Sequence, residues 1–544
     1  MIHKSLRRTS RGHLPVLNIT VIAAAVAVAA IVFAVVPNGR MLSYDRDPPQ
    51  EAAAELKVNT PPIHPGVYAF YDSDNLSPVE YPWLTGGVIV RRWNQISAGP
   101  GVLDWSPLDR WIEREARVGK RVILRVSPHD GWWRGNNLDG TPGWVYDEGV
   151  PTVHLSTGAV YPEYWHPIYK QYLGEFIAAL GTKYDGDPRV EAVEMGVGLY
   201  GEAFPGPDDP AWVSAGLSDE VWTAYVKEII DDYAAAFAQT PVIFMEQFYP
   251  QGNFNQLGVT TDYAAQKGVH VGFNGLRAED ETAWSDGIWP SPGWHSPFGK
   301  WVMSGLRLGR FEAHNAFGDP ALVYWAVLNA LDSRATYLSL YQVDVTNPAN
   351  RQAFDFAQQH LGKTVYDTPD VWIALRGASK GLRDPKPHNY TFGLTQNDPD
   401  GTSVALWKVG GKEGLFARRT DQNSGKDYMS FKIDGRYWRE APTSLVEVTV
   451  TYLDKGTDTW EMQYDSADDP YKPAGTVTKA NSGEWKAATF KLEDAYLGGR
   501  QQGGADLRIH SNRDGDDIFH MVKLAVPSGP VPAPPGVPDE TIDE

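Results

Sequence analysis

Short apolar segments alternate with longer amphipathic ones between residues 65 and 376. Eight short segments have the apolar character of buried strands: VYAF near Val67, GGVIVRRW near Val88, RVILRV near Val122, VEAVEMGVG near Val193, PVIFMEQF near Ile243, GVHVGF near Val269, GRFEA near Phe311 and TYLSLY near Leu338. Parallel strands that are buried on both faces have such near-continuous apolar runs. The eightfold alternation predicts a (β/α)8 barrel over residues 62–376.

The segments between these strands carry helix signals. The clearest is Ser106-Pro107-Leu108-Asp109, in which Ser106 is expected as the N-cap, Pro107 opens the helix and Asp109 lies in the first turn. Apolar residues recur at helical spacing after it, and Gly119 ends the run. A second amphipathic helix is expected from Trp222 to Phe237. These helices supply the connections that a barrel of parallel strands requires.

The periodicity changes after about Arg376. Residues 386–526 contain strands of period two and turn clusters, of which LVEVTVTYLD, TWEMQYDS, WKAATFKL and ADLRIHS are the clearest strands. This pattern predicts an all-β, jelly-roll-like sandwich that serves as an accessory domain. Residues 527–544 form a Pro-rich acidic tail, and residues 37–61 have no sustained apolar period and are expected to be a linker.

The amino terminus has the pattern of a membrane anchor. Residues 1–13 contain four basic and no acidic side chains, and residues 14–36 are uncharged and rich in Ala, Val and Ile. As a helix, such a stretch crosses the ~30 Å hydrocarbon core, whereas a cleaved signal has a shorter apolar region. Basic residues stay cytoplasmic, so we expect a transmembrane helix with the rest of the chain outside the cytoplasm. If the segment is instead cleaved, the protein is secreted.

Composition narrows the classes of function. The formal charge of −19 argues against a nucleic-acid partner, because binding to duplex DNA or RNA requires a basic face. The absence of cysteine excludes disulfides, thiolate metal sites and a cysteine nucleophile. The chain also has 20 Trp and 26 Tyr, whose flat rings pack in cores and stack well on the apolar faces of sugars.

Three glutamates follow predicted strands at the end of the barrel where active sites lie. Glu202 follows the fourth strand, Glu246 ends the fifth and Glu312 ends the seventh. Cleavage of a glycosidic bond requires a pair of carboxylic acids, one that protonates the leaving oxygen and one that attacks the sugar or activates water. The fourth and seventh strands lie nearly across a barrel, which would allow Glu202 and Glu312 to face each other over a bound sugar.

The stretch VIVRRWNQISAGPGVLDWSPLDRWIEREARVGKRVILRV resembles the region from the second to the third strand of β-galactosidase-like enzymes. These belong to the clan of retaining (β/α)8 glycoside hydrolases. The resemblance implies that Glu202 is the acid/base and Glu312 the nucleophile of a double-displacement mechanism. Many clan members have Asn directly before the acid/base, where this chain has Gly201. Glu194 therefore remains an alternative acid, and Glu246 an alternative nucleophile.

Further residues near the predicted strand ends are candidates for substrate binding. They are Trp93, Asn94, His129, Trp132, Tyr200, Glu246, Asn274, His314 and Tyr341. The tryptophans suit a sugar platform but also suit a barrel lid, and His314 suits either an orienting role or a solvated loop. No H-E-x-x-H metal motif, phosphate loop or G-x-S-x-G elbow is present, so we expect no metal and no cofactor.

The sandwich has weaker signals. Trp438, Trp460 and Trp485 are either glycan contacts or core residues, and Asp514, Asp516 and Asp517 form either a turn or a calcium site. Taken together, the sequence predicts a membrane-anchored, extracytoplasmic glycoside hydrolase that acts on a poly- or oligosaccharide. Two alternatives stay open: a catalytically inactive carbohydrate-binding surface protein with the same barrel, and a barrel enzyme of different chemistry.

Overall fold

The computed structural model describes the two folded regions that the sequence predicts. The described residues are 63–70, 80–130, 140–246, 254–276, 278, 309–313, 318–332, 334–376, 389–397, 404–406, 417–438 and 444–527. Within these ranges no helix is both long and apolar enough to cross a bilayer. The predicted transmembrane segment 14–36, the linker 37–61, Trp132 and His314 lie outside the described residues.

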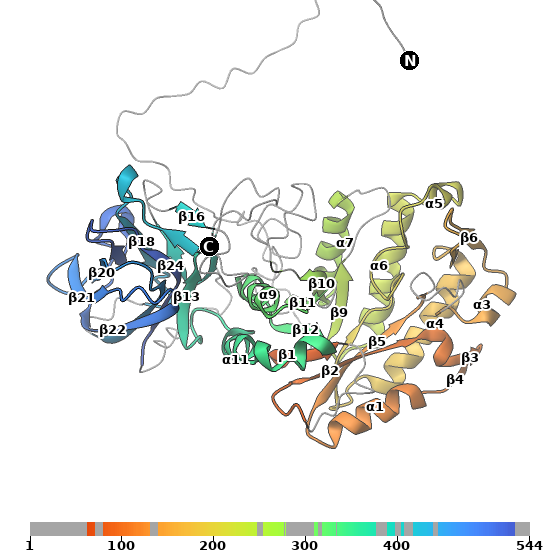
Figure 1. The fold of residues 1–544 in the computed structure, drawn as a ribbon. Helices are drawn as coiled ribbons and strands as arrows, with labels where there is room; N and C mark the ends of the chain where they lie inside the picture. The colour runs from red at the N-terminus through yellow and green to blue at the C-terminus, as the bar shows by residue number, and fades with distance from the viewer. Residues whose placement is uncertain are drawn as a thin grey trace, which may run out of the picture. The chain divides into compact units, whose positions relative to one another are not determined.

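The first region is a closed barrel of eight parallel strands (Figure 1). In chain order these are β1 (Gly66–Phe70), β2 (Gly86–Arg92), β5 (Arg121–Ser127), β8 (Val190–Glu194), β9 (Val242–Glu246), β10 (His270–Leu276), β11 (Gly309–Ala313) and β12 (Tyr337–Tyr341). The ring closes because β1 pairs in parallel with both β2 and β12. All eight predicted strands are confirmed, and so is the (β/α)8 fold.

Helices connect the barrel strands. They are α1 (Ser106–Ala116), α3 (Gly143–Asp147), α4 (Pro167–Tyr184), α5 (Pro210–Ser214), α6 (Asp219–Ala236), α7 (Phe254–Gln266), α9 (Pro320–Asp332), α10 (Gln342–Val345) and α11 (Arg351–His360), with short 3₁₀ turns at η1 (Trp93–Gln95) and η5 (Pro348–Asn350). Two small hairpins decorate the loops: β3 (Ser97–Gly99) with β4 (Val102–Leu103), and β6 (Thr152–His154) with β7 (Val160–Pro162).

One helix start differs from its prediction. Ser106 is the first residue of α1 and not its N-cap. The N-cap is Trp105, whose side chain makes no capping hydrogen bond. The carboxylate of Asp104, one residue earlier, binds the start of the helix: its Oδ1 accepts from the backbone N–H of Ser106 at 3.0 Å and its Oδ2 from the Ser106 hydroxyl at 3.1 Å. The longer and more acidic side chain two residues upstream therefore replaces Ser106 at the helix start.

The barrel interior is filled by side chains. One buried cluster lies inside the ring of strands and includes Ile123, Ala192, Ile243 and Met245. Gly272 of β10 is required there, since a Cβ at this position would lie 2.4 Å from the sulfur of Met245. The interior is thus a packed core, and any substrate must bind at the strand ends.

The second region consists of two antiparallel sheets. The seven-stranded sheet contains β13 (Asp370–Ala374), β14 (Tyr390–Phe392), β16 (Val404–Leu406), β17 (Ala417–Arg419), β19 (Ser444–Leu453), β22 (Trp485–Ala495) and β24 (Ile518–Ala525). The five-stranded sheet contains β15 (Leu394–Gln396), β18 (Tyr428–Ile433), β20 (Thr459–Tyr464), β21 (Lys472–Thr478) and β23 (Leu507–His510). The 3₁₀ turns η6 (Gln422–Ser424) and η7 (Gln502–Gly504) lie in its loops.

Both sheets contribute to one core. Val448 and Leu524 come from the seven-stranded sheet, and Phe431 and Ile509 come from the five-stranded sheet. The domain boundary differs from the prediction. Strand β13 lies inside the predicted barrel range 62–376, yet it pairs antiparallel with β24 and β14 of the sandwich. Its sequence DVWIA is as apolar as a barrel strand, so composition alone did not assign it.

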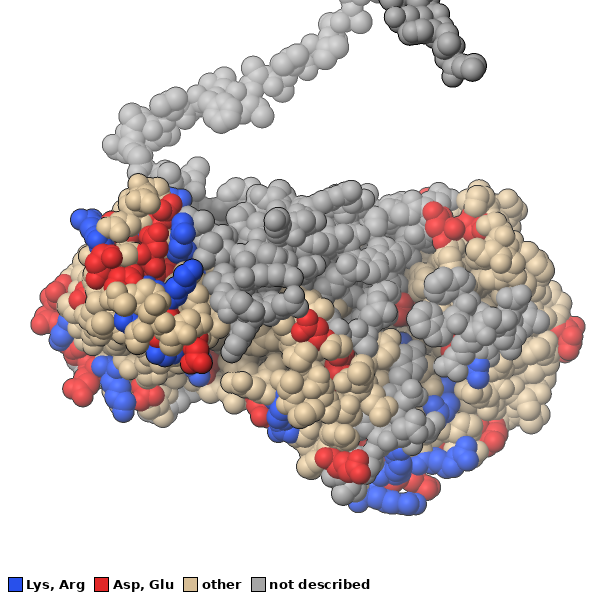
Figure 2. All heavy atoms as spheres, in the orientation of Figure 1, with Lys and Arg blue, Asp and Glu red and all other residues tan. Residues whose placement is uncertain are grey.

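Charge is distributed unevenly over the face drawn in Figure 2. Acidic side chains occur over both regions, in line with the formal charge of −19. Basic side chains gather near α1, whose sequence contains Arg110 and Arg114.

Candidate active site

The register of the barrel strands places Glu312, Asn274 and Ser339 side by side on three adjacent strands. Glu312 of β11 is aligned with Asn274 of β10 on one side and with Ser339 of β12 on the other. Ser339 is fully buried. For Glu312, Asn274 and Glu246 the structure describes the backbone positions only, and it places Glu246 at the last residue of β9. Two predicted site residues are therefore neighbours across adjacent strands.

Glu202 lies in the loop that follows β8 and is almost fully buried. The loop makes a tight turn, in which the N–H of Gly201 donates to the carbonyl of Gly198 and that of Glu202 to Leu199. Tyr200 and Gly201 have φ values of 59° and 85°, in the left-handed region. A Cβ at position 201 would also lie 3.0 Å from Cδ of Arg125. Both observations suit a residue without a Cβ at position 201.

Helix α6 holds this loop through side chains. The hydroxyl of Tyr225 donates to the carbonyl of Val197 at 2.6 Å, and the indole N–H of Trp222 donates to the carbonyl of Ala203 at 3.1 Å. These bonds lie on both sides of Glu202 in the sequence, so they fix the backbone around the candidate acid.

A buried ion pair lies beneath the loop. Nε of Arg125 on β5 donates to Oε2 of Glu194 at the end of β8, at 2.5 Å, and neither residue has measurable solvent exposure. The guanidinium also donates to the carbonyl of Tyr200 at 3.4 Å. Glu194, the alternative acid, is thus bound to Arg125 inside the barrel.

Sequence reasoning missed Arg125. The available signal was a basic residue in the centre of the apolar strand RVILRV, since a charged residue within a buried strand requires a partner. The guanidinium carbon Cζ of Arg125 lies 5.4 Å from the ring centroid of Phe70, the last residue of β1. Tyr341, the last residue of β12, packs edge-on against Phe70 with ring centroids 5.4 Å apart. Phe70 and the predicted Tyr341 thus lie at the carboxyl ends of adjacent strands.

His129 supports the loop from below. Its backbone carbonyl accepts from the N–H of Tyr200 at 2.9 Å, and its fully buried ring lies next to Tyr161. Burial lowers the pKa of His129 to about 3, although a hydrogen bond with the backbone of Val160 opposes the shift. The ring is therefore neutral at neutral pH. Contact with a sugar would require its packing to open.

The second-strand candidates differ in exposure. Trp93 is fully buried and packs against Trp144, Tyr169 and Phe176, so it lies in the core and offers no ring face to solvent. Asn94, the next residue, is exposed, and its N–H donates to the carbonyl of Gly140 at 2.7 Å. Of this pair, Asn94 is the one that a ligand can reach in the described structure.

The acidic residues of the sandwich form a turn. The carboxylate of Asp514 accepts from Thr459, that of Asp516 from the N–H of Gln422, and that of Asp517 pairs with Lys479 at 2.8 Å. Throughout the described ranges, no group of three or more His, Asp or Glu side chains could hold a metal ion. Trp438 and Trp460 are core residues, whereas Trp485 is half-buried.

No protein-family model matches the chain, and no curated protein matches it. Among solved structures, the chain is similar to the catalytic domain of a β-amylase from Paenibacillus polymyxa. That match has 10% sequence identity over 55% of this chain and 99% of the other, with a TM-score of 0.41. It is also similar to a β-galactosidase from the psychrophilic Marinomonas ef1, with 12% identity over 54% of this chain and 59% of the other, and a TM-score of 0.35.

Proposed function

We propose that the chain is a glycoside hydrolase that cleaves O-glycosidic bonds of a poly- or oligosaccharide. The observation that supports this proposal is the position of two glutamates at the strand ends of one closed barrel. Glu202 follows β8 and Glu312 lies on β11, which is three strands away around the ring of eight. Catalytic groups of such barrels come from the carboxyl ends of different strands, and glycosidic cleavage needs two carboxylic acids.

In the proposed mechanism, Glu312 attacks the anomeric carbon while Glu202 protonates the leaving oxygen. Water then hydrolyses the glycosyl-enzyme, and Glu202 accepts its proton. The fixed loop around Glu202 would hold the acid at one place during both steps. The reaction retains the anomeric configuration, so the anomer that NMR detects first should match that of the substrate. An inverted first product would contradict the nucleophilic role of Glu312.

The test is a pair of isosteric substitutions assayed on a panel of glycan polymers and aryl glycosides. Glu202→Gln and Glu312→Gln should each lower kcat by about two or more orders of magnitude while leaving the fold intact. Glu246→Gln is assayed beside them, because Glu246 ends β9 and is the alternative nucleophile. If Glu202→Gln and Glu312→Gln both keep nearly full activity, the assignment fails. A loss of activity in Glu246→Gln alone would move the nucleophile to β9. A chain that binds glycans without hydrolysing any would instead be the inactive binding protein.

We also propose that residues 14–36 anchor the protein in a membrane, with the barrel outside the cytoplasm. Support comes from the uncharged length of this stretch and from the basic residues that precede it.

A further inference from the structure

The outer face of the five-stranded sheet carries a cation without an ionic partner. Along β23, Leu507 and Ile509 point into the sandwich core, and Arg508 between them faces outward and is half-buried. Its Nε and Nη2 both donate to Oε1 of Gln463 on β20, at 2.8 and 2.6 Å. Arg508 forms no ion pair with any residue that the structure describes.

Several other partly or fully buried cations in this domain have a carboxylate partner. Arg500 pairs with Asp465 at 2.6 Å, Arg436 with Asp434 at 2.7 Å and Lys479 with Asp517 at 2.8 Å. Burial lowers the pKa of the Arg508 guanidinium, whereas Tyr471, Tyr428 and Glu461 oppose this shift. A partly desolvated cation is costly unless an anion or hydrogen bonds compensate for it. Arg508 differs from these three cations because its hydrogen-bond partner among the described residues, Gln463, is neutral.

Two tyrosines hold the guanidinium in place. Its Cζ lies 4.2 Å from the ring centroid of Tyr471 and 5.4 Å from that of Tyr428. The tyrosines are tied to η7, because the Tyr428 hydroxyl donates to the side chain of Gln502 at 3.3 Å and the Tyr471 hydroxyl accepts from the Gln502 N–H at 2.7 Å. A planar guanidinium between aromatic rings is preorganised for a planar anion such as a carboxylate.

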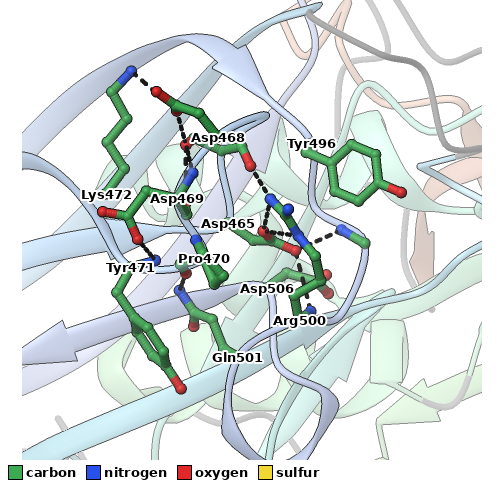
Figure 3. A network of polar contacts seen from close by, with 12 residues as sticks. Asp465, Asp468, Asp469, Pro470, Tyr471, Lys472, Tyr496, Arg500, Gln501 and Asp506 are labelled. Atoms are coloured by element: carbon green, nitrogen blue, oxygen red, sulfur yellow. Dashed lines mark hydrogen bonds and ion pairs between the residues drawn. The ribbon is translucent and has the colours of Figure 1, made fainter.

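A network of polar contacts surrounds the backbone next to Tyr471 (Figure 3). The carboxylate of Asp469 accepts from the N–H of Tyr471 at 2.8 Å, and the side chain of Gln501 donates to the carbonyl of Pro470 at 2.7 Å. Arg500, next to Gln501, is bound in turn to Asp465. The loop that carries Gln501 and Gln502 is thus fixed before any ligand arrives.

Charged side chains of both signs lie around Arg508. Lys432 occupies another outward position of the same sheet, and the carboxylate of Asp469 is bound to the backbone of Tyr471. A further acid on this face is Glu461, whose Oε1 accepts from Nε2 of Gln463 at 2.6 Å. Gln463 therefore lies between the two, with its carbonyl bound to Arg508 and its amide group to Glu461. This leaves the remaining N–H groups of Arg508 for a ligand.

We propose that this face binds the carboxylates of a uronate-containing polysaccharide, with Arg508 as the hydrogen-bond donor to the carboxylate and Tyr428 and Tyr471 as ring contacts. The choice of a polysaccharide rests on the proposed glycosidase function, while the choice of a carboxylate rests on Arg508. The proposed ligand is therefore an acidic glycan chain.

The test measures binding of the full chain in detergent to polygalacturonate, alginate and hyaluronan, each compared with its carboxyl-reduced form. We expect binding to at least one uronate polymer. The affinity for its carboxyl-reduced form should be at least about tenfold lower, because hydrogen bonds to charged groups are lost. Arg508→Gln should weaken binding of the acidic polymer about tenfold while the chain stays folded, which circular dichroism checks. Lys491→Gln, which removes a positive charge that is 68% exposed on β22 of the other sheet, is the matched control and should have little effect.

Several results would overturn the inference. These are no binding of any uronate polymer, equal binding of the reduced forms, unchanged binding by Arg508→Gln, or equally tight binding of dextran sulfate, which would indicate attraction by charge alone. Binding is separable from catalysis. Arg508→Gln should keep full activity on a small aryl glycoside, and Glu202→Gln should keep uronate binding. Uronate binding by a chain that hydrolyses nothing would leave this inference standing and the glycosidase proposal refuted.

Discussion

Arg125 and Glu194 form a buried charge pair that contributes more to position than to stability. Removing two charges from water offsets most of their mutual attraction, so such a pair is seldom a net source of stability. Arg125 makes a further bond to the carbonyl of Tyr200, and its aliphatic part lies against Gly201. Tyr200 and Gly201 directly precede Glu202, and both have left-handed backbone conformations. We infer that the pair fixes the turn that carries the candidate acid.

The raised pKa of the Asp506 carboxyl predicts that stability depends on pH. Burial, the main cause, raises the pKa of its carboxyl to about 6 from 3.8, the charge of Asp465 adds to the shift, and hydrogen bonds from the N–H groups of Ile433 and Gly499 oppose it. The folded state therefore binds this proton more tightly than the unfolded state does. The stabilising contribution is complete below pH 3.8 and is lost as pH rises to about 6.

The measurement compares denaturant unfolding of the wild type and Asp506→Asn at several pH values between 4 and 7.5. The variant cannot titrate at this position, so the difference between the two isolates Asp506 from other groups. The free energy of unfolding of the wild type relative to the variant should fall by about 3 kcal/mol across this interval and be constant above it. A difference that rises with pH, or that does not change, would contradict the raised pKa.

At the scale of elements, the barrel strands could be predicted because each is a short, near-continuous apolar run between longer amphipathic segments. Strand β13 shows the limit of that reasoning, since DVWIA is equally apolar and its pairing with β24 depends on residues some 150 positions away. Site residues were predicted from their place after strands. Burial of Trp93 and His129 depends on α4 and the β6–β7 hairpin, which cover them through Tyr169, Phe176 and Tyr161. Such long-range covering leaves no local mark in the sequence.

The attachment of the β8 loop to α6 predicts the effect of a single hydroxyl. Tyr225→Phe removes the bond to the carbonyl of Val197 and leaves that buried carbonyl without this partner, which should lower the free energy of unfolding by about 1–2 kcal/mol. Because the loop carries Glu202, we expect kcat to fall about tenfold with little change in KM.

The control for this prediction is Tyr263→Phe. Its hydroxyl donates to the carboxylate of Asp231 at 2.8 Å in a part-buried contact between α7 and α6, away from the β8 loop. It should leave kcat nearly unchanged. Equal effects of the two substitutions on kcat would show that the attachment of the loop to α6 has no special role in catalysis.

At the scale of the whole molecule, the two proposed binding surfaces suit one kind of substrate. The barrel is proposed to cleave a glycan, and the sheet face around Arg508 to bind an acidic one. The chain itself has a formal charge of −19, so an acidic polymer would be repelled at long range. Binding would then depend on the local site at Arg508, and it should tighten at first as salt screens the repulsion.

The last prediction concerns the membrane. The uncharged stretch 14–36 is long enough to cross a bilayer as a helix, and the four basic residues before it should remain on the cytoplasmic side. The full-length chain should therefore sediment with membranes and resist extraction by high salt, and protease added outside intact cells should degrade everything after Arg40. Replacing Val26 and Ala29 with Arg should release the chain from the pellet, because charges at the centre of a spanning helix are costly, whereas Leu at both positions should not. Recovery of a soluble chain that begins near Pro37 would instead identify the stretch as a cleaved signal.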